Sequence, residues 1–143
     1  MKREDIVAQA RRWKEPKTPW RHRGRTPTGL DCAGLLLIVA DHFDHPYEDV
    51  AGYGRLPDGS RFVNHLKAQF DPVPAGSPLR IGQIVVLRDG PLPCHCGIIG
   101  QDRYGRLTLI HCSVSRRGVV EETWDDHWQR AFRCALEYKG VED

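Results

Sequence analysis

Cys32 is the residue of this sequence whose position most favours nucleophilic chemistry. It follows a loop rich in glycine and proline and precedes the apolar run 33–40, so we expect it to begin a buried helix. Unpaired N–H groups at a helix N-terminus stabilise a thiolate, and they also donate hydrogen bonds to an oxyanion formed on a substrate carbonyl. A small buried cysteine without a chemical role is the alternative that this position leaves open.

Two histidines are expected to supply the base that a reactive thiol needs. In a hairpin centred on residue 103, His95 lies opposite His111, on one face of the sheet and with Cβ atoms roughly 4.5–5.5 Å apart. One imidazole would take the thiol proton while the other fixes the tautomer and orientation of the first. Gly97 would leave room on this face for the end of the Cys32 helix. Either histidine alone is more simply interpreted as a polar residue with satisfied hydrogen bonds.

Zinc binding by the same two strands is a weaker interpretation. Five soft or borderline ligands are present, namely Cys94, His95, Cys96, His111 and Cys112. Their spacing is not that of a structural zinc knuckle, and alternation along a strand turns each histidine away from the cysteines beside it. The sequence therefore predicts no metal ion and no other cofactor.

Length and composition indicate what kind of protein holds these residues. The chain has 143 residues, of which 40% are hydrophobic and 28% charged, as expected for a single domain over residues 1–143. Its five cysteines are an odd number and no apolar leader follows the first residues, so we expect neither a disulfide scaffold nor a signal peptide. The apolar run 33–40 is much shorter than the roughly 20 residues that span a membrane.

The net charge of +2 is unevenly distributed. Residues 1–25 carry nine Lys or Arg and three acidic residues, whereas residues 121–143 carry three and seven. A basic arm can bind nucleic acid, but prolines interrupt this one and it has no array of aromatic side chains on which bases could stack. We therefore expect a solvated basic face and no nucleic-acid partner.

The rest of the chain must supply the elements that position the cysteine and the histidines. Apolar residues at helical spacing predict helices over 4–14, 31–42 and from residue 60, with a loop at 47–59 and a Pro-rich connector at 71–78. Beyond this connector, alternating apolar residues predict strands at 84–88, 95–100, 107–113, 119–123 and 131–138. Helices followed by a meander of strands indicate an α+β domain whose antiparallel sheet packs on the buried helix.

Four segments between Thr18 and Thr123 carry recognisable motifs. They are GRTPTGLDCAGLLLIVAD, which includes the cysteine, then RIGQIVVLRDG, HCGIIG and LIHCSVSRRGVVEE. In this order they resemble the nucleophile motif D-C-(S/A)-G-(L/F) and the following strands of NlpC/P60 cysteine peptidases. The resemblance implies a papain-like α+β fold in which Cys32 is the nucleophile, His95 the general base and His111 the orienting residue.

The resemblance also implies a substrate, because these peptidases hydrolyse amide bonds in peptidoglycan stem peptides, often between γ-D-glutamate and diaminopimelate. This sequence departs from the family pattern at three positions. Ala33 follows the nucleophile where the family often has Ser, Gln83 replaces a usual Asp, and Trp20 replaces a Tyr that helps to line the oxyanion site. We expect Trp20 and Asp31 to line the oxyanion and substrate site, and an aromatic lid or an anchor of the loop is the alternative role for Trp20.

The loop before the nucleophile is basic, and Arg21, Arg23 and Arg25 are expected to meet carboxylates of the substrate. TPWRHRGRTPTGLDCAGL and YGRLPDGS resemble members of the family from phage tails and gene-transfer agents. That subgroup implies synthesis in the cytoplasm, incorporation among other tail proteins of a virion, and action in the cell envelope. Two alternatives remain, a structural tail protein without activity and a thiol amidase or acyltransferase that acts on lipid or small-molecule amides.

Overall fold

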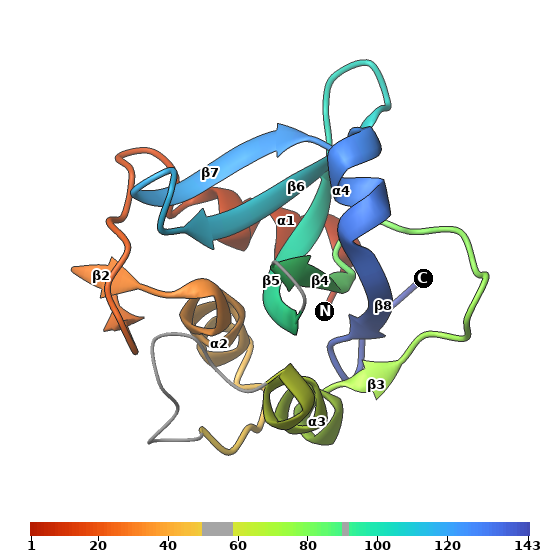
Figure 1. Cartoon of the computed structure of the whole chain (residues 1–143), viewed down its shortest axis with the longest axis horizontal. Helices are drawn as coiled ribbons and strands as arrows, with labels where there is room; N and C mark the ends of the chain where they lie inside the picture. Colours follow the sequence, from red (N-terminus) through yellow and green to blue (C-terminus); the bar gives the residue numbers. More distant parts are fainter. Residues whose placement is uncertain (50–58, 90–91) are drawn as a thin grey trace.

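The three longer helices come first in the chain, and the strands of the main sheet follow them (Figure 1). The computed structural model describes residues 1–49, 59–89 and 92–143, so most of the loop expected at 47–59 lies outside the described residues. The first half contains α1 (Arg3–Arg11), β1 (Arg25–Thr26), β2 (Gly29–Leu30), α2 (Cys32–His42) and α3 (Gly59–Gln69). The second half contains β3 (Asp71–Pro72), β4 (Ile84–Asp89), β5 (Leu92–Gln101), β6 (Leu107–Ser113), β7 (Gly118–Thr123), α4 (Asp126–Ala131) and β8 (Phe132–Glu137).

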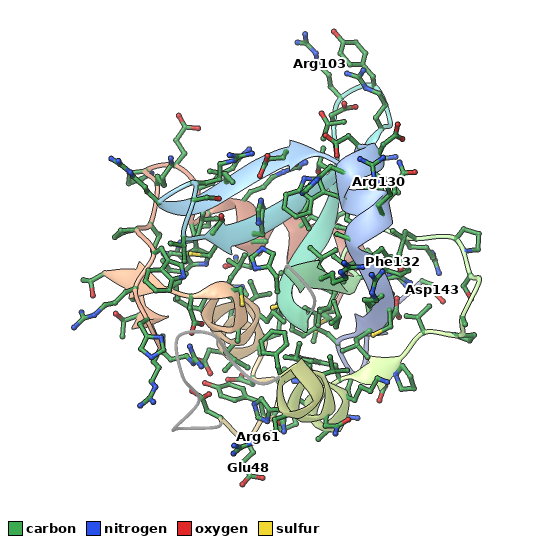
Figure 2. The ribbon with its side chains drawn as sticks, in the orientation of Figure 1. Glu48, Arg61, Arg103, Arg130, Phe132 and Asp143 are labelled. Carbon is green, nitrogen blue, oxygen red and sulfur yellow. The ribbon has the colours of Figure 1, made fainter. Side chains whose placement is uncertain are left out.

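The strands from β3 onward form one antiparallel sheet in the order β3-β8-β4-β5-β6-β7. Strands β4 to β7 follow one another as a meander, and β8 returns to pair with the free side of β4. The loop between β5 and β6 projects from the sheet and carries Arg103 (Figure 2). The expected α+β class, with an antiparallel sheet packed on a buried helix, is confirmed.

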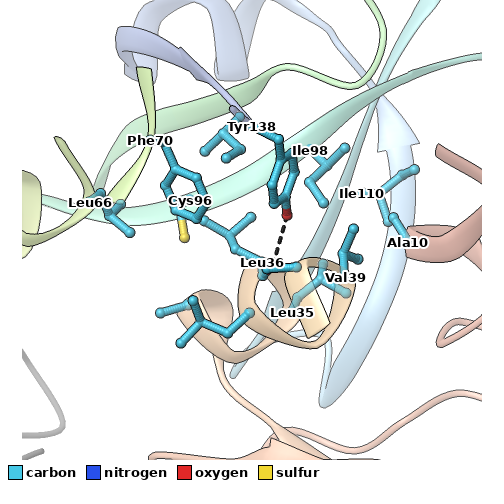
Figure 3. Packing of buried hydrophobic residues seen from close by; sticks show 14 of the residues in the cluster. Ala10, Leu35, Leu36, Val39, Leu66, Phe70, Cys96, Ile98, Ile110 and Tyr138 are labelled. Carbon is cyan, nitrogen blue, oxygen red and sulfur yellow. Dashed lines mark hydrogen bonds between the residues drawn. The ribbon is translucent and has the colours of Figure 1, made fainter. Parts of the chain in front are cut away.

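Helix α2 is the buried helix that packs against the sheet (Figure 3). Its N-cap is Asp31, whose side chain accepts a hydrogen bond from the Gly34 amide at 2.7 Å. Leu35 and Leu36 are fully buried, and the Tyr138 hydroxyl donates to the Leu36 carbonyl at 2.8 Å. Because the helix is apolar on nearly every face, packing on all sides fixes its position relative to the sheet.

The sheet separates two layers of apolar side chains. Alternate residues of the central strands, among them Cys96, Ile98 and Ile110, pack in the larger cluster with residues of α1, α2 and α3. Ile99 and Leu109, which point the other way, belong to a second cluster. Aromatic side chains around α4 pack against that cluster, namely Trp124, Trp128 and Phe132. Side chains of β5 and β6 therefore meet the helices on one face and the α4 segment on the other.

Helix α4 is an element that the sequence pattern did not reveal. The predicted strand 131–138 is β8 at Phe132–Glu137, and a short helix precedes it at Asp126–Ala131. Asp125 caps this helix, because its side chain accepts a hydrogen bond from the Trp128 amide at 3.2 Å. The sequence signal for this helix was Asp125, an acidic residue before a polar segment that does not alternate.

Two other boundaries also differ from the prediction. The helix expected over 4–14 ends at Arg11, because the chain turns there and the Trp13 carbonyl accepts from the Thr18 amide at 2.8 Å. The connector 71–78 begins with the short strand β3, which pairs with β8 at the edge of the sheet. Neither difference moves the cysteine or the two histidines.

The register of the β5–β6 hairpin is shifted by two residues from the predicted one. Ile98 pairs with Ile110, so the hairpin is centred on residue 104 and His111 is not directly opposite His95. The turn explains the shift, since the Asp102 carboxylate accepts hydrogen bonds from the Tyr104 and Arg106 amides. The predicted pairing was wrong. A shift of two residues nevertheless leaves every side chain on its face.

Among residues 1–49, 59–89 and 92–143, no helix is long and apolar enough to cross a membrane.

Candidate active site

Cys32 is the first residue of α2, as predicted, and its side chain is half-buried. A tight contact holds this end of the helix in place. A Cβ atom at Gly34 would lie 2.0 Å from the Gly24 carbonyl oxygen, so the loop before β1 packs directly on the first turn. Asp31 is buried and also accepts from the Arg25 guanidinium at 2.7 Å. The Asp31 N-cap, the loop packed at Gly24 and the ion pair of Asp31 with Arg25 together fix the position of the Cys32 thiol.

His95 and His111 are in direct contact across β5 and β6. The His95 Nε2 and His111 Nδ1 atoms are 2.8 Å apart, and the two rings are nearly perpendicular. Since the register makes the histidines diagonal neighbours, the contact depends on long side chains and not on directly opposed Cβ atoms. His111 is 1% exposed, and the Trp128 ring packs edge-on against it with centroids 5.0 Å apart.

Gly97 makes this contact possible, but not in the way the sequence suggested. A Cβ atom there would lie 2.6 Å from Leu109 Cδ1 and 3.0 Å from His111 Cβ. The space is therefore used by β6, whereas we expected it to admit the end of the Cys32 helix. A side chain at Gly97 would push β6 away from β5 at the position of the histidine pair.

The acidity of the Cys32 thiol is set by groups on β5. A hydrogen bond from the Cys96 thiol is the main cause that lowers the pKa of Cys32 to about 6, and the hydrogen bond and charge of His95 act in the same direction. Burial and the charge of Asp31 oppose them. Burial and the neighbouring thiolate raise the pKa of Cys96 well above its ordinary value, so Cys96 keeps its proton and donates it. These contacts make the Cys32 thiol more acidic than an ordinary cysteine and so favour its thiolate form.

His111 is held neutral by its surroundings. Burial, followed by the charge of His95, lowers its pKa to about 4, although Glu122 opposes this shift. The His111 Nε2 atom is 2.5 Å from Glu122 Oε2. Glu122 was missed at the sequence level. Its place on β7, diagonal to His111 in the observed register, shows why: only strand pairing brings the two together.

The residues predicted to surround the nucleophile differ in their placement. The backbone at Trp20 bridges to Leu30, and its half-buried side chain packs against the large apolar cluster near α2. Arg21 and Arg23 are exposed on the same loop. Arg25 is half-buried, and its guanidinium binds the carboxylates of Asp31 and Asp49.

Two of the three cysteines considered as zinc ligands, Cys96 and Cys112, point away from the histidines. Cys96 and Cys112 are buried in the cluster on the α2 side, and the Cys112 thiol donates to the Leu30 carbonyl at 3.0 Å. The side chain of Cys94 lies outside the described part of the chain. Among the side chains that are described, no group of three or more His, Cys, Asp or Glu is placed to hold a metal ion.

Comparison with known proteins identifies the architecture. No protein-family model matches the sequence, and no curated protein matches it. Among solved structures, the crystal structure of the NlpC/p60 domain of the peptidoglycan hydrolase SagA matches with a TM-score of 0.61 and 19% sequence identity. The match covers 94% of this chain and 97% of that one. The fold is that of an NlpC/p60 domain, and the expected papain-like architecture is confirmed.

Proposed function

We propose that this protein is a cysteine peptidase of the NlpC/P60 family that hydrolyses an amide bond in peptidoglycan stem peptides. The observation that carries the proposal is the chain of contacts from Cys32, at the start of α2, to His95 and then to His111. The motif resemblance supports the substrate class, and so does a fold shared with a domain of a peptidoglycan hydrolase. On this proposal, residues 1–143 act as one catalytic domain without a cofactor.

The first half of the reaction forms a thioester. The Cys32 thiolate attacks the carbonyl carbon of the scissile amide, and the negative charge moves to the carbonyl oxygen. The carbon–nitrogen bond then breaks as the His95 imidazolium donates its proton to the leaving amine. The amine departs, and the acyl group stays on the Cys32 sulfur.

The second half hydrolyses the thioester. Neutral His95 takes a proton from water, and the resulting hydroxide attacks the acyl carbon. The carbon–sulfur bond breaks, the carboxylic acid leaves, and the thiolate–imidazolium pair is restored. A thiol of lowered pKa makes both halves easier, because it is the better attacking group at neutral pH and the better leaving group afterwards.

Donors for the oxyanion are available at the helix terminus. The Cys32 amide lies in the first turn of α2, where backbone N–H groups have no partner within the helix. The Trp20 indole is the proposed second donor, since an N–H group is sufficient for an oxyanion that only accepts. Arg21 and Arg23 are exposed on the loop that precedes the nucleophile, and we propose that they meet substrate carboxylates.

The proposal is tested with purified muropeptides and mass spectrometry of the products. We expect Cys32→Ser to reduce hydrolysis by about three orders of magnitude or more, with an unchanged melting temperature because little cavity is opened. His95→Ala should reduce the rate of hydrolysis nearly as much. His111→Ala should reduce it less, because an orienting residue only positions the base. Substantial turnover by Cys32→Ser would refute the assignment of the nucleophile.

The same experiment separates the proposal from its two alternatives. Wild-type protein that leaves muropeptides intact but is alkylated at Cys32 and cleaves other amides is a thiol amidase or acyltransferase. Protein with neither activity is a structural component. The finer assignment to a phage tail or gene-transfer agent rests on motif resemblance, and detection of the protein in purified particles tests it.

A further inference from the structure

A continuous line of hydrogen-bonding groups leads from β7 to the candidate nucleophile. The Glu122 Oε2 atom is 2.5 Å from His111 Nε2, and the His111 Nδ1 atom is 2.8 Å from His95 Nε2. Both ring nitrogens of His111 are therefore engaged. Because His95 uses Nε2 in this contact, Nδ1 is the nitrogen left for Cys32, with which His95 also interacts.

The chemistry of the Glu122 carboxylate determines which atom donates and which accepts in each of these hydrogen bonds. An ionised carboxylate only accepts hydrogen bonds, so the His111 nitrogen that faces Glu122 must carry the proton. A neutral imidazole has a single N–H group, so the Nδ1 atom of His111 is an acceptor. It must receive its hydrogen bond from His95 Nε2. Neutral His95 then has an unprotonated Nδ1 atom that faces the thiol, as a base requires.

Without Glu122, nothing in this line of contacts selects the tautomer of His111. With its proton on Nδ1, His111 would donate to His95 Nε2, and the proton of neutral His95 would move to Nδ1. That nitrogen could no longer take a proton from Cys32 or from water. Imidazolium formation at His95 would also be opposed, because two N–H groups would face each other between the histidines.

The surroundings keep Glu122 ionised and His111 neutral. Burial alone would raise the pKa of Glu122, but hydrogen bonds from Arg116 and His111 hold it below its ordinary value. The Arg116 Nη2 atom is 3.0 Å from Glu122 Oε1, the oxygen that His111 does not use. The charged or titratable groups that face His111 are thus His95, Glu122 and Arg116, with the Trp128 ring covering the imidazole.

We infer that Glu122 is a positioning residue that acts through His111 and determines which nitrogen of His95 is free to serve as the base. The inference rests on the proposed thiol-peptidase function for its consequence in catalysis. The tautomers of the two histidines, and the reactivity of Cys32 toward an alkylating agent, do not depend on the identity of the substrate. They provide tests that remain valid if the proposed substrate is wrong.

The first test needs no variant. Nitrogen-15 NMR of histidine-labelled wild-type protein at pH 7 should show His111 as a neutral ring with its proton on Nε2. A His111 ring protonated on Nδ1, or on both nitrogens, overturns the inference. Resonances are assigned from the loss of signals in His111→Ala.

The second test replaces Glu122 on β7, and its neighbour Glu121 serves as the control. Glu122→Leu removes the acceptor, and Glu122→Gln replaces it with a neutral group that both accepts and donates. For each variant we expect the pH midpoint of Cys32 alkylation by iodoacetamide to move upward. We also expect kcat to fall by about ten- to a hundredfold with little change in KM, the usual scale for a residue behind the reacting groups.

Glu121→Gln is the matched control. Glu121 precedes Glu122, and it binds Arg11, Lys14 and Thr108 on the opposite side of the sheet, so its loss also breaks ion pairs. We expect it to lower stability while leaving the His111 tautomer and the alkylation midpoint unchanged. If Glu121→Gln moves that midpoint as far as Glu122→Leu does, or Glu122→Leu does not move it, the inference fails.

A double-mutant cycle shows whether the effect passes through His111. In a His111→Ala background, Glu122→Leu should have no further effect on alkylation or kcat. An undiminished effect in that background contradicts the inference. Wild-type protein that fails to cleave muropeptides defeats the proposed function alone, whereas active wild-type protein with an insensitive Glu122 defeats this inference alone.

Discussion

At the scale of single residues, the reactivity of Cys32 depends on a second thiol. Position at a helix N-terminus favours the thiolate, but the largest contribution to the lowered pKa is the hydrogen bond from Cys96. Cys96 is fully buried beside His95, the proposed base, on β5 and keeps its proton. One strand therefore contributes the proposed base from one of its faces and a donor to the thiolate from the other.

Cys96→Ala tests this dependence. Loss of the donor should raise the pKa of Cys32, so the pH midpoint of alkylation should move upward by about one unit, the scale of one weak hydrogen bond to a charge. Peptidase activity near pH 6 should fall more than activity near pH 8. Both are measured as pH profiles.

Cys112→Ala is the control for Cys96→Ala. It removes a buried thiol from the same layer, but that thiol donates to the Leu30 carbonyl and not to Cys32. We expect a loss of stability and an unchanged alkylation midpoint. An identical shift in both variants would mean that the midpoint reports general loosening of the core.

At the scale of secondary structure, the site depends on how closely β5 and β6 approach. Gly97 allows this approach, because the Leu109 side chain and the Ile110 carbonyl occupy the space where a Cβ atom would be. The histidine contact lies next to this point. The β5–β6 hairpin thus contributes side chains to the core and also holds His95 and His111 in position.

Gly97→Ala is expected to affect stability and activity together. Its Cβ atom would meet Leu109 Cδ1 at 2.6 Å and the Ile110 carbonyl oxygen at 2.8 Å, so the strands must separate. Overpacking of this kind costs about 1–3 kcal/mol of the free energy of unfolding. Chemical denaturation measures the loss, and kcat should fall because the histidines move apart. A fully active, fully stable variant would disprove the steric argument.

At the scale of the whole molecule, two titratable groups, the buried His111 and the half-buried Glu121, couple stability to pH. Hydrogen bonds from Arg11 and Lys14 of the N-terminal region, with that of Thr108, outweigh burial and lower the pKa of Glu121 to about 2. Burial lowers the pKa of His111 to about 4. Both shifts make the folded state bind fewer protons than the unfolded chain in mildly acidic solution.

Stability should therefore fall in two stages as the solution is acidified. His111 has its unfolded pKa near 6.5 and its folded pKa at about 4, so stability is lost as the pH falls across that interval. Glu121 contributes stability above pH 4.5 that is lost as the pH falls toward about 2. Each stage spans about 2.5 pKa units and amounts to roughly 3–4 kcal/mol, at about 1.4 kcal/mol per pKa unit. Denaturation curves at a series of pH values measure both.

Glu121→Gln identifies the second stage. The variant should be less stable than the wild type at pH 7, and the difference should shrink as the pH falls toward 2, where Glu121 begins to take up a proton in the folded state as well. A difference that stays constant between pH 5 and pH 2 would show that the ion pairs of Glu121 do not stabilise the fold.

The sequence by itself determined the features that arise from local patterns. The apolar run after Cys32 specified a buried helix, and alternation specified the strands, including β6 at its observed bounds. The alternation of side chains along a strand also determined that His95 and His111 share a face of the sheet. A register shift by an even number of residues leaves this conclusion unchanged. These features depend on neighbours within a few positions along the chain.

Tertiary structure decided the contacts between elements. The Asp102 turn moved the hairpin register by two residues, and strand pairing brought Glu122 to His111. Packing of α2 against β5 placed the Cys96 thiol beside Cys32. None of these follows from periodicity. The turn depends on the hydrogen bonds of one side chain, and the contacts of Glu122 and Cys96 join residues that are distant in sequence. The sequence was therefore sufficient to identify Cys32, His95 and His111 as candidates. Only the folded sheet showed that Cys96 and Glu122 are their partners.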